Sequence, residues 1–211
     1  AGSAVTMNSW LDNVPAILDV WYPGEQGGNA ISDVIFGKVN PSGKLPITFP
    51  KSYSQYPANF YSYDSKIEYK EDIYVGYRYF DKYKKEVLFP FGHGLSYTDF
   101  KYSKLKISAK KNTTNVFVKI ENIGNSDGAD VIQLYIRDLE SSVDRPIKEL
   151  KAFKKVYLKK GEKMTIEFNL IDRAFAFWDD VSKDWKVESG EFEILIGKSS
   201  RDIILKKIIK I

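Results

Sequence analysis

The sequence predicts part of an α/β domain followed by an all-β sandwich. Near the N-terminus an apolar run, a glycine-containing loop and a helical pattern follow one another, as in α/β units. From about residue 100 onward, apolar and polar residues alternate with a period of two, and no helical pattern intervenes. We therefore expect an α/β portion over residues 1–50, an aromatic-rich connector over residues 51–99 and a β-sandwich over residues 100–211.

The α/β portion is expected to be incomplete. The apolar residues 16–21, stopped by Pro23, are typical of a strand that is buried on both faces of a parallel sheet. Residues 29–36 then place apolar side chains on one helical face, and Gly37 supplies a C-terminal stop. Because one such unit cannot bury both faces of a parallel sheet, we expect the rest of that sheet to come from outside this chain.

The connector holds many aromatic residues but little periodicity. A long irregular segment is uncommon in a compact domain unless it wraps over a surface, and aromatic side chains supply contact area for doing so. We expect the aromatic residues between Tyr53 and Tyr63 to pack against the β-sandwich or against a part of the protein outside this chain. Stacking on sugar rings is the alternative interpretation.

Four segments of alternating apolar residues predict half-buried strands, and turn-forming residues separate them at positions 122–128, 160–162 and 188–190. Several short strands at this spacing, without helices between them, predict an antiparallel β-sandwich. The alternating sets are Val116, Val118 and Ile120; Ile132, Leu134 and Ile136; Met164, Ile166, Phe168 and Leu170; and Phe192, Ile194 and Ile196.

The composition argues against several classes of protein. The formal net charge of +4 comes from 32 basic and 28 acidic residues interspersed along the chain, which does not indicate a nucleic-acid-binding surface. No apolar run approaches the ~20 residues of a membrane-spanning helix. The absence of cysteine excludes disulfides and zinc–thiolate sites. It favours the cytoplasm only weakly and leaves the compartment open, because many exported proteins also lack cysteine.

Two groups of segments resemble one enzyme family, glycoside hydrolase family 3. The first group resembles the end of the family's α/β sandwich domain, and the second resembles its fibronectin type III-like domain. The first group consists of Trp21–Gly28, Asp33–Gly37, Asn40–Pro46, Glu71–Asp81 and Phe89–Thr98. The second consists of Gln133–Tyr135, Arg145–Pro146, Glu149–Phe153 and Gly197–Ser200. Together they span nearly the whole chain.

The resemblance implies a retaining, exo-acting β-glucosidase that hydrolyses terminal non-reducing β-D-glucosyl residues without a cofactor. The family's aspartate nucleophile lies in an N-terminal barrel, and its acid/base glutamate would precede the segment that aligns with Ala1. We therefore expect no catalytic residue in this chain, which by itself should be inactive. The implied partners are the barrel and the remainder of the α/β domain, in the same or a separate chain, and a β-glucoside substrate.

Two alternatives stay open. The chain could act as a noncatalytic carbohydrate-binding or interaction module through exposed aromatic residues. Within the family, β-xylosidase and N-acetylglucosaminidase specificities are the other alternative, because sugar choice depends on pocket residues that we expect outside this chain.

Glu25 is the candidate substrate-binding residue. It lies in a loop between the expected strand and helix, at the crevice position where open α/β sheets commonly bind ligands. The competing interpretation, which we favour, is structural: Gly24, Gly27 and Gly28 form the turn, and Glu25 caps the helix.

Glu71 is the candidate catalytic residue. With Glu68 and Asp72 it forms a carboxylate cluster before an expected aromatic strand, and neighbouring carboxylates can divide acid and base roles when their environments differ. The competing interpretation, which we favour, is an ion-pair network with Arg78 at the domain junction.

The remaining conspicuous residues are expected to be structural. His93 is the single histidine of the chain, so a histidine-based metal site or catalytic triad lacks partners, and we expect a packed turn residue and no metal site. Trp178 and Trp185 flank an expected turn at positions 179–180 and are expected to pack rather than to bind a ligand.

Overall fold

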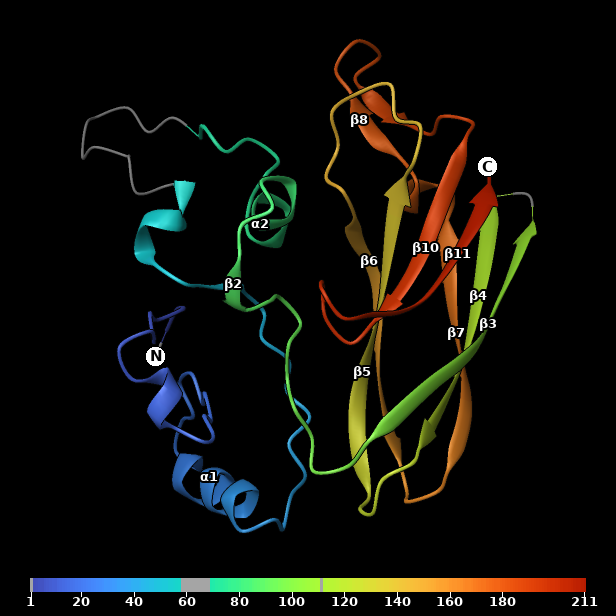
Figure 1. The fold of residues 1–211 in the computed structure, drawn as a ribbon. Helices are drawn as coiled ribbons and strands as arrows, with labels where there is room; N and C mark the ends of the chain where they lie inside the picture. Colours follow the sequence, from blue (N-terminus) through green and yellow to red (C-terminus); the bar gives the residue numbers. More distant parts are fainter. Residues whose placement is uncertain (1, 58–68, 111) are drawn as a thin grey trace.

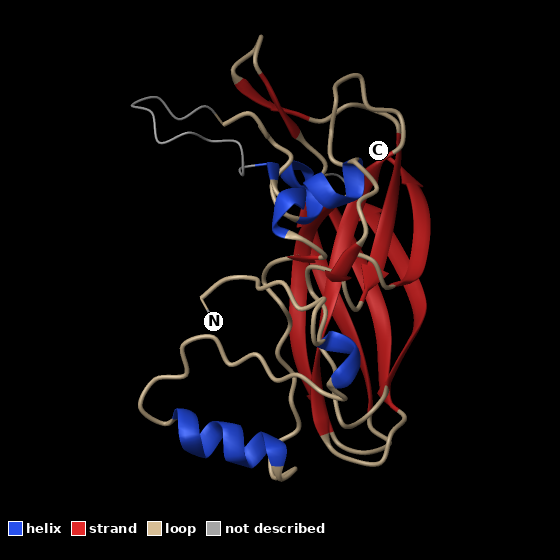
Figure 2. Cartoon of the chain, turned by 60° about the vertical axis from the view of Figure 1, so that its left-hand side comes forward, coloured by secondary structure: helices blue, strands red, loops and turns tan. Residues whose placement is uncertain are grey.

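The structure is a computed structural model that describes residues 2–57, 69–110 and 112–211. Two antiparallel sheets pack face to face as a β-sandwich, and the preceding residues lie along one side of it (Figure 1). The helices are short and lie outside the sheets (Figure 2). Within the described ranges, no helix is long and apolar enough to cross a membrane.

Seven antiparallel strands of the described chain form the two layers of the sandwich, which confirms the predicted all-β architecture of this part. The four-stranded sheet has the order β11 (Ile203–Lys210), β10 (Glu191–Gly197), β5 (Gly128–Asp138) and β6 (Glu149–Leu158). The three-stranded sheet has the order β3 (Phe100–Lys110), β4 (Thr113–Asn122) and β7 (Lys163–Ile171).

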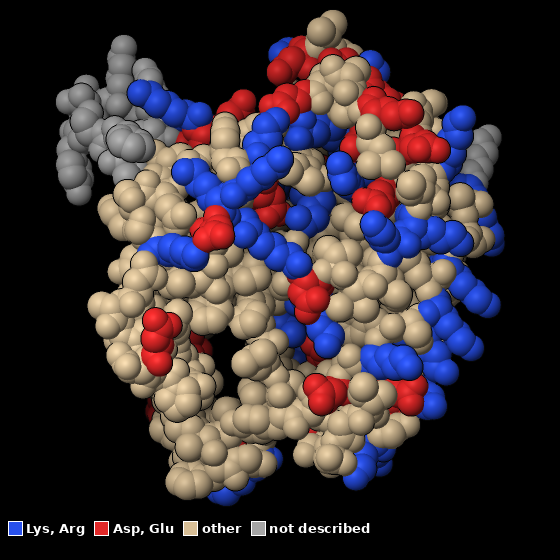
Figure 3. All heavy atoms as spheres, viewed as in Figure 1, with Lys and Arg blue, Asp and Glu red and all other residues tan. Residues whose placement is uncertain are grey.

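The core of the sandwich consists of the alternating residues that the sequence predicts. All the predicted sets from β4, β5, β7 and β10 are buried between the sheets except for Met164. Met164 lies close to the turn at residues 160–162, where water reaches the end of β7, and it is exposed. The opposite faces carry polar residues, among them the exposed Lys104 and Lys106 of β3. Figure 3 shows basic and acidic side chains interspersed over much of one face.

A small hairpin projects from one end of the sandwich. It consists of β8 (Phe177–Asp179) and β9 (Asp184–Lys186), and it follows a 3-10 helix, η4 (Asp172–Ala174). Trp178 and Trp185 face each other across the hairpin, with ring centroids 5.7 Å apart in an edge-to-face arrangement. The predicted packing of the two tryptophans is therefore confirmed, and the pair stabilises a two-stranded ribbon that would be marginal alone.

The N-terminal portion contains one of the two regular elements that the sequence predicts there. Helix α1 (Gly27–Ile35) forms, and Gly37 follows it with a positive φ of 72°, as a C-terminal stop requires. The predicted buried strand at residues 16–21 is wrong, because the segment is irregular and partly exposed. A parallel strand needs a paired neighbour, and the described residues provide none. A 3-10 turn, η1 (Leu11–Asn13), precedes this segment.

The described part of the connector contains short regular elements. Strands β1 (Phe49–Pro50) and β2 (Val87–Phe89) pair with each other, and between them lie the 3-10 helix η2 (Tyr53–Gln55) and helix α2 (Tyr77–Lys82). The aromatic strand expected after Asp72 is therefore wrong, because that stretch forms α2.

The aromatic residues predicted to pack are only partly described. Tyr56 packs edge-to-face on Phe80 of α2, with centroids 5.9 Å apart, whereas Tyr53 is largely exposed. Phe60, Tyr61 and Tyr63 lie outside the described residues.

Substitution of Ile194 by Ala tests the position of the core. Ile194 is fully buried between the sheets, so the variant loses apolar burial and leaves a cavity, and the free energy of unfolding should fall by about 2–5 kcal/mol. Ile208→Ala is the control, because Ile208 is about half exposed and should change the value by less than about 1 kcal/mol. Urea denaturation of both variants measures the difference; equal losses would contradict this assignment of the core.

Candidate functional site

Glu25 lies in an exposed turn immediately before α1. Of the three glycines predicted to form the turn, only Gly24 precedes the helix, with a φ of 68°. Gly27 and Gly28 are the first residues of α1, and a Cβ atom on Gly27 would lie 2.8 Å from the ring of Pro23. Helix α1 begins after Gln26, and no side chain caps it with a hydrogen bond. The predicted cap by Glu25 is therefore wrong. Its role in substrate binding stays a prediction, because the strand expected to form the crevice is absent.

Glu71 sits in a short turn ahead of α2. Its Oε2 atom is buried and has no hydrogen-bond partner among the described residues. The expected ion pair with Arg78 is replaced, in the described structure, by a contact of 3.9 Å between Arg78 Nη2 and Glu149 Oε1 on β6. Arg78 therefore does take part in a charged contact at the domain junction, but its acidic partner is Glu149 rather than Glu71. Glu68 lies outside the described residues.

His93 is a packed turn residue, as predicted. Its N–H donates to the carbonyl of Pro90 (3.1 Å), its carbonyl accepts from Leu45 (2.8 Å), and its ring stacks on Phe89 with centroids 5.2 Å apart. Burial, and then the positive charge of Lys44, lower the pKa of His93 below its ordinary value. Within the part of the chain that the structure describes, no group of three or more histidine or acidic side chains could hold a metal ion.

A cluster centred on Asp81 joins α2 to two loops of the sandwich. The carboxylate of Asp81 accepts from Lys148 Nζ at 2.6 Å and from Arg201 Nε at 3.1 Å. Arg201 Nη2 also donates to the carbonyl of Phe80 (3.2 Å) in the last turn of α2 and to the carbonyl of Lys85 (2.7 Å) just beyond the helix. The side chain of Asp81 is only 8% exposed, so the charge is nearly buried and depends on these partners. We call Asp81, Lys148 and Arg201 the Asp81 cluster.

Tyr77 adds an aromatic contact to the same junction. Its hydroxyl accepts the backbone N–H of Leu150 on β6 at 2.8 Å. Its ring stacks on Phe91 with centroids 4.9 Å apart and meets the fully buried ring of Tyr135 edge-to-face. Burial raises the pKa of Tyr77. Helix α2 is therefore fixed to the sandwich through both polar and apolar contacts.

Gln133 fastens the end of the connector to the sandwich. Its Nε2 donates to the carbonyls of Gly92 (3.0 Å) and Lys198 (2.7 Å), and its Oε1 accepts from the hydroxyl of Tyr135. Gly92 has a φ of 81°, and a Cβ atom there would lie 2.2 Å from Gln133 Oε1. The close approach and the backbone conformation both require glycine at this position.

A second buried ion pair lies where residues 40–46 meet β5. Lys44 Nζ contacts Asp130 Oδ1 at 3.0 Å and donates to the carbonyl of Gly94 at 3.0 Å. The other oxygen of Asp130 accepts from the hydroxyl of Tyr102 at 2.7 Å. Burial and the adjacent Asp130 charge raise the pKa of Tyr102. Every charged group of this ion pair is thus paired, as buried charges require.

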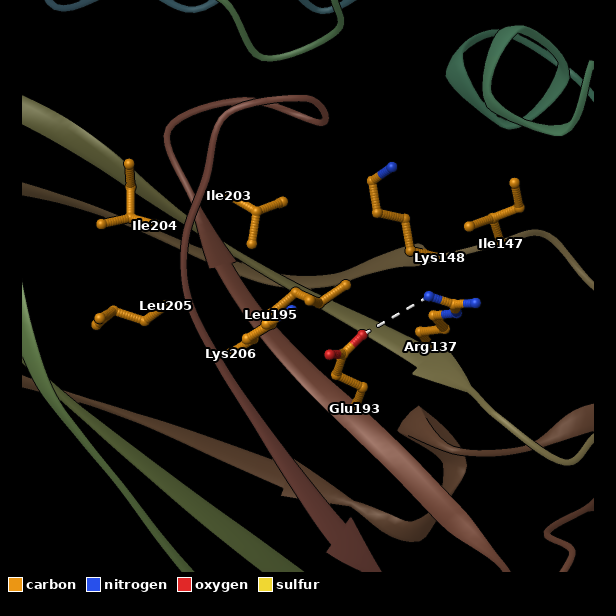
Figure 4. A pocket seen from close by; sticks show the side chains of 9 residues that line it. All are labelled: Arg137, Ile147, Lys148, Glu193, Leu195, Ile203, Ile204, Leu205 and Lys206. Atoms are coloured by element: carbon orange, nitrogen blue, oxygen red, sulfur yellow. Dashed lines mark ion pairs between the residues drawn. The ribbon is translucent and has the colours of Figure 1, made fainter. Parts of the chain in front are cut away.

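A groove of about 350 Å³ opens beside β10 and β11 (Figure 4). Its charged lining residues are Arg137, Lys148, Lys206 and Glu193, and the other lining residues are aliphatic. Arg137 and Glu193 approach each other to 3.9 Å, as the dashed line in Figure 4 marks. One carboxylate among three cations does not provide paired acidic groups for general acid–base chemistry.

The family follows from comparisons with known proteins. Residues 1–97 match the model of the glycosyl hydrolase family 3 C-terminal domain, and residues 130–200 match the fibronectin type III-like domain. A relative from Acetivibrio thermocellus, named thermostable beta-glucosidase B, is 50% identical over 100% of this chain, which covers 28% of that relative. This chain belongs to glycoside hydrolase family 3.

The solved structures agree with this family 3 assignment. The crystal structure of the GH3 beta-glucosidase of Bifidobacterium adolescentis superposes with a TM-score of 0.95 at 41% identity, covering 99% of this chain and 32% of that one. An exo-alpha-(1->6)-L-arabinopyranosidase of Bifidobacterium breve is 42% identical over 96% of this chain, which covers 27% of it. The family 3 chain spans 25% to 28% of the length of the curated relatives that it matches.

The sequence did not reveal the side chains that join the connector of this family 3 chain to its sandwich. Asp81 and Arg201 are 120 positions apart, and neither lies in a local pattern that indicates pairing. For Gln133 the sequence does contain an indication, because this polar residue lies within an apolar strand segment. The structure shows that it is buried. Buried amides need partners, so a contact to a neighbouring segment could have been predicted there.

Asp81→Asn tests whether the Asp81 cluster fixes the junction. The change leaves two cations without their carboxylate, one of them nearly buried, so the free energy of unfolding should fall by roughly 3 kcal/mol. Asp144→Asn is the matched control, because Asp144 pairs with Lys82 at an exposed position, and its loss should cost less than about 1 kcal/mol. Urea denaturation of both variants is the measurement. Similar losses from the two would show that the cluster contributes no more than a surface pair.

The lowered pKa of His93 predicts a loss of stability in acid. Its folded-state pKa lies below the unfolded value of about 6.5, so the stabilisation is fully present above that pH and is lost as pH falls through the folded pKa. The stability difference between the wild-type chain and His93→Gln should therefore shrink between about pH 7 and about pH 5. Denaturation curves across this range measure it, and a difference independent of pH would contradict the desolvation of the partly buried ring.

Proposed function

We propose that this chain is the C-terminal portion of a retaining, exo-acting β-glucosidase that hydrolyses terminal non-reducing β-D-glucosyl residues. One observation carries the proposal. Relatives named as beta-glucosidases match between 96% and 100% of the chain, yet the chain spans only 25% to 28% of their length. The nucleophile and the acid/base residue then belong to the part of the protein outside this chain, as the family resemblance implies.

The positions of the candidate carboxylates favour a structural role for this chain rather than a catalytic one. Retaining hydrolysis needs two carboxyl groups about 5 to 5.5 Å apart across the glycosidic bond. Glu25 is exposed in a turn, and the buried oxygen of Glu71 has no partner among the described residues. The connector, fixed on the sandwich by the Asp81 cluster, is a rigid surface against which the barrel and the remainder of the α/β domain can assemble. We keep the division into residues 1–50, 51–99 and 100–211 as part of this proposal.

Hydrolysis of an aryl β-D-glucoside by the isolated chain and by the complete protein tests this function. The complete protein should release the aryl group, whereas the isolated chain, verified by intact mass, should show no rate above the uncatalysed background, because both reacting carboxyls are absent. Turnover by the isolated chain would overturn the proposal. Glycan binding without turnover by the complete protein would favour a noncatalytic module.

The sugar that the complete protein accepts needs its own measurement. A relative at 42% identity carries the name of an arabinopyranosidase, so relatives of this chain differ in sugar specificity. A panel of aryl β-glucosides, β-xylosides, N-acetyl-β-glucosaminides and α-L-arabinopyranosides should show the highest kcat/KM for the β-glucoside. Preference for another sugar would retain the family and change the substrate.

A further inference from the structure

His93 faces a cavity of about 200 Å³ between the sandwich and the residues that precede it. Lys44 and His93 line this cavity from the segment that matches the glycosyl hydrolase family 3 C-terminal domain. Asp130 and Lys198 line it from the segment that matches the fibronectin type III-like domain. The cavity therefore lies at a contact between the two domains, and a change of charge in it acts on both.

The backbone around His93 attaches Leu45 to the sandwich. The N–H of Leu45 donates to the carbonyl of His93 (2.8 Å), and the carbonyl of Leu45 accepts from the N–H of Gly92 (2.8 Å). The carbonyl of Gly92 in turn accepts from Gln133 on β5. Leu45 is thus joined to the sandwich through the loop that carries the histidine.

Lys44 makes the second attachment at the same place. Its Nζ contacts Asp130 Oδ1 and donates to the carbonyl of Gly94, each at 3.0 Å. The side chains of Lys44 and Asp130 are 13% and 6% exposed, so the pair is nearly buried and its charges act strongly on a neighbouring charge. We call the contacts of residues 44–45 with residues 92–94 and with Asp130 the His93 latch.

The ring of His93 suits the neutral form of imidazole. One face stacks on Phe89, and the ring nitrogens have no hydrogen-bond partner among the described residues. An imidazolium has two N–H donors, and its burial is unfavourable when they lack acceptors. Asp130 is already engaged, because its carboxylate accepts from the hydroxyl of Tyr102 and the N–H of Val131 as well as pairing with Lys44.

The other charges at the cavity do not remove this disadvantage. The remaining charged side chains that line it are Lys198, Asp99 and Asp202. Burial lowers the pKa of His93 most, Lys44 lowers it further, and Asp202 raises it. The net pKa lies below its ordinary value, so the folded contacts around the ring oppose its protonation.

We propose that protonation of His93 opens the His93 latch, so that residues 44 and 45 separate from the sandwich in acid while the two sheets stay folded. An imidazolium that turns into water gains hydration and moves away from Lys44. Glycines on both sides of His93 give the loop the backbone freedom to move with the ring.

The opening should be local, because the neighbouring attachments do not titrate. Asn40 donates to the carbonyl of Asp127, and the hydroxyl of Tyr97 donates to the carbonyl of Val34. Both are neutral hydrogen bonds, so they hold residues 34–40 at any pH at which the sandwich is folded. The His93 latch is stable above the unfolded pKa of about 6.5 and weakens as pH falls through the folded pKa.

Hydrogen exchange of the Leu45 and Gly92 amides in this chain is the test. After correction for the intrinsic pH dependence of exchange, their protection should fall at least about fivefold between about pH 7.5 and about pH 5. The strand amides of β5 should keep their protection. The chain has one histidine, so its ring signals in NMR spectra give the midpoint of titration directly, and the loss of protection should follow that midpoint.

Three variants connect the opening to the charge on the ring. His93→Gln should abolish the pH dependence of Leu45 and Gly92 protection. Asp202→Asn removes the charge that favours the imidazolium, so the midpoint should move to lower pH. Asp99→Asn is the matched control, because Asp99 lines the same cavity without shifting the pKa of His93, and the midpoint should stay unchanged.

Three outcomes would overturn the latch proposal. The first is protection of Leu45 and Gly92 that does not change while the ring titrates. The second is an equal fall in His93→Gln, which would assign the opening to another group. The third is a parallel loss of protection in β5, which would show that acid unfolds the whole sandwich rather than the latch.

Discussion

The carboxylate of Asp81 is nearly buried, and a buried charge is tolerated only with close partners. Its two partners come from different parts of the sandwich: Lys148 precedes β6, and Arg201 lies between β10 and β11. Helix α2, which carries Asp81, has only six residues and is too short to be stable alone. The Phe80 carbonyl in its last turn and the Lys85 carbonyl just beyond it both accept from Arg201, so the sandwich pairs the charge of the helix and one of its terminal carbonyls. The position of the connector follows from this constraint.

The same constraint extends along the connector in both directions. Toward the C-terminus, β2 leads to Gly92, whose carbonyl accepts from Gln133, so the chain enters the sandwich already attached to β5. Toward the N-terminus, Gly76, with a φ of 59°, joins α2 to the short turn that contains Glu71. The residues around α1 are attached by neutral hydrogen bonds, from the Tyr97 hydroxyl to the Val34 carbonyl (2.9 Å) and from Asn40 Nδ2 to the Asp127 carbonyl (3.0 Å), and Phe36 and Ile35 remain largely exposed. These exposed apolar side chains are consistent with a portion that needs further partners.

Sequence periodicity predicted the sandwich because each strand is half buried. Val118 and Ile194 are buried in the core, and a shift of either strand by one residue would turn its apolar side chains toward water. The prediction was wrong at residues 16–21, where an apolar run forms a strand only if a neighbouring strand pairs with it. It was wrong again at α2, where tertiary contacts outweigh the aromatic character of the segment. The prediction that Arg78 pairs with an acidic residue was correct, but the predicted partner was wrong, because Arg78 contacts Glu149 on β6. Contacts between residues far apart in sequence leave no local pattern. The sequence could therefore indicate which segment holds the candidate residues, but not which residues they contact in the folded chain.

The contacts of the Asp81 cluster predict that helix α2 of the connector and the sandwich unfold as one unit. Native-state hydrogen exchange of the isolated wild-type chain, measured at increasing urea concentrations, tests this most directly. The amide of Tyr83, which caps α2 and donates to the Tyr79 carbonyl, should open with the same free energy as the strand amides of β5 and β10. The amide of Leu150, which donates to the Tyr77 hydroxyl, should exchange with them. If α2 and Leu150 exchange at a much lower free energy while the strands stay protected, the connector is only loosely attached, and the Asp81 cluster does not fix it to the sandwich.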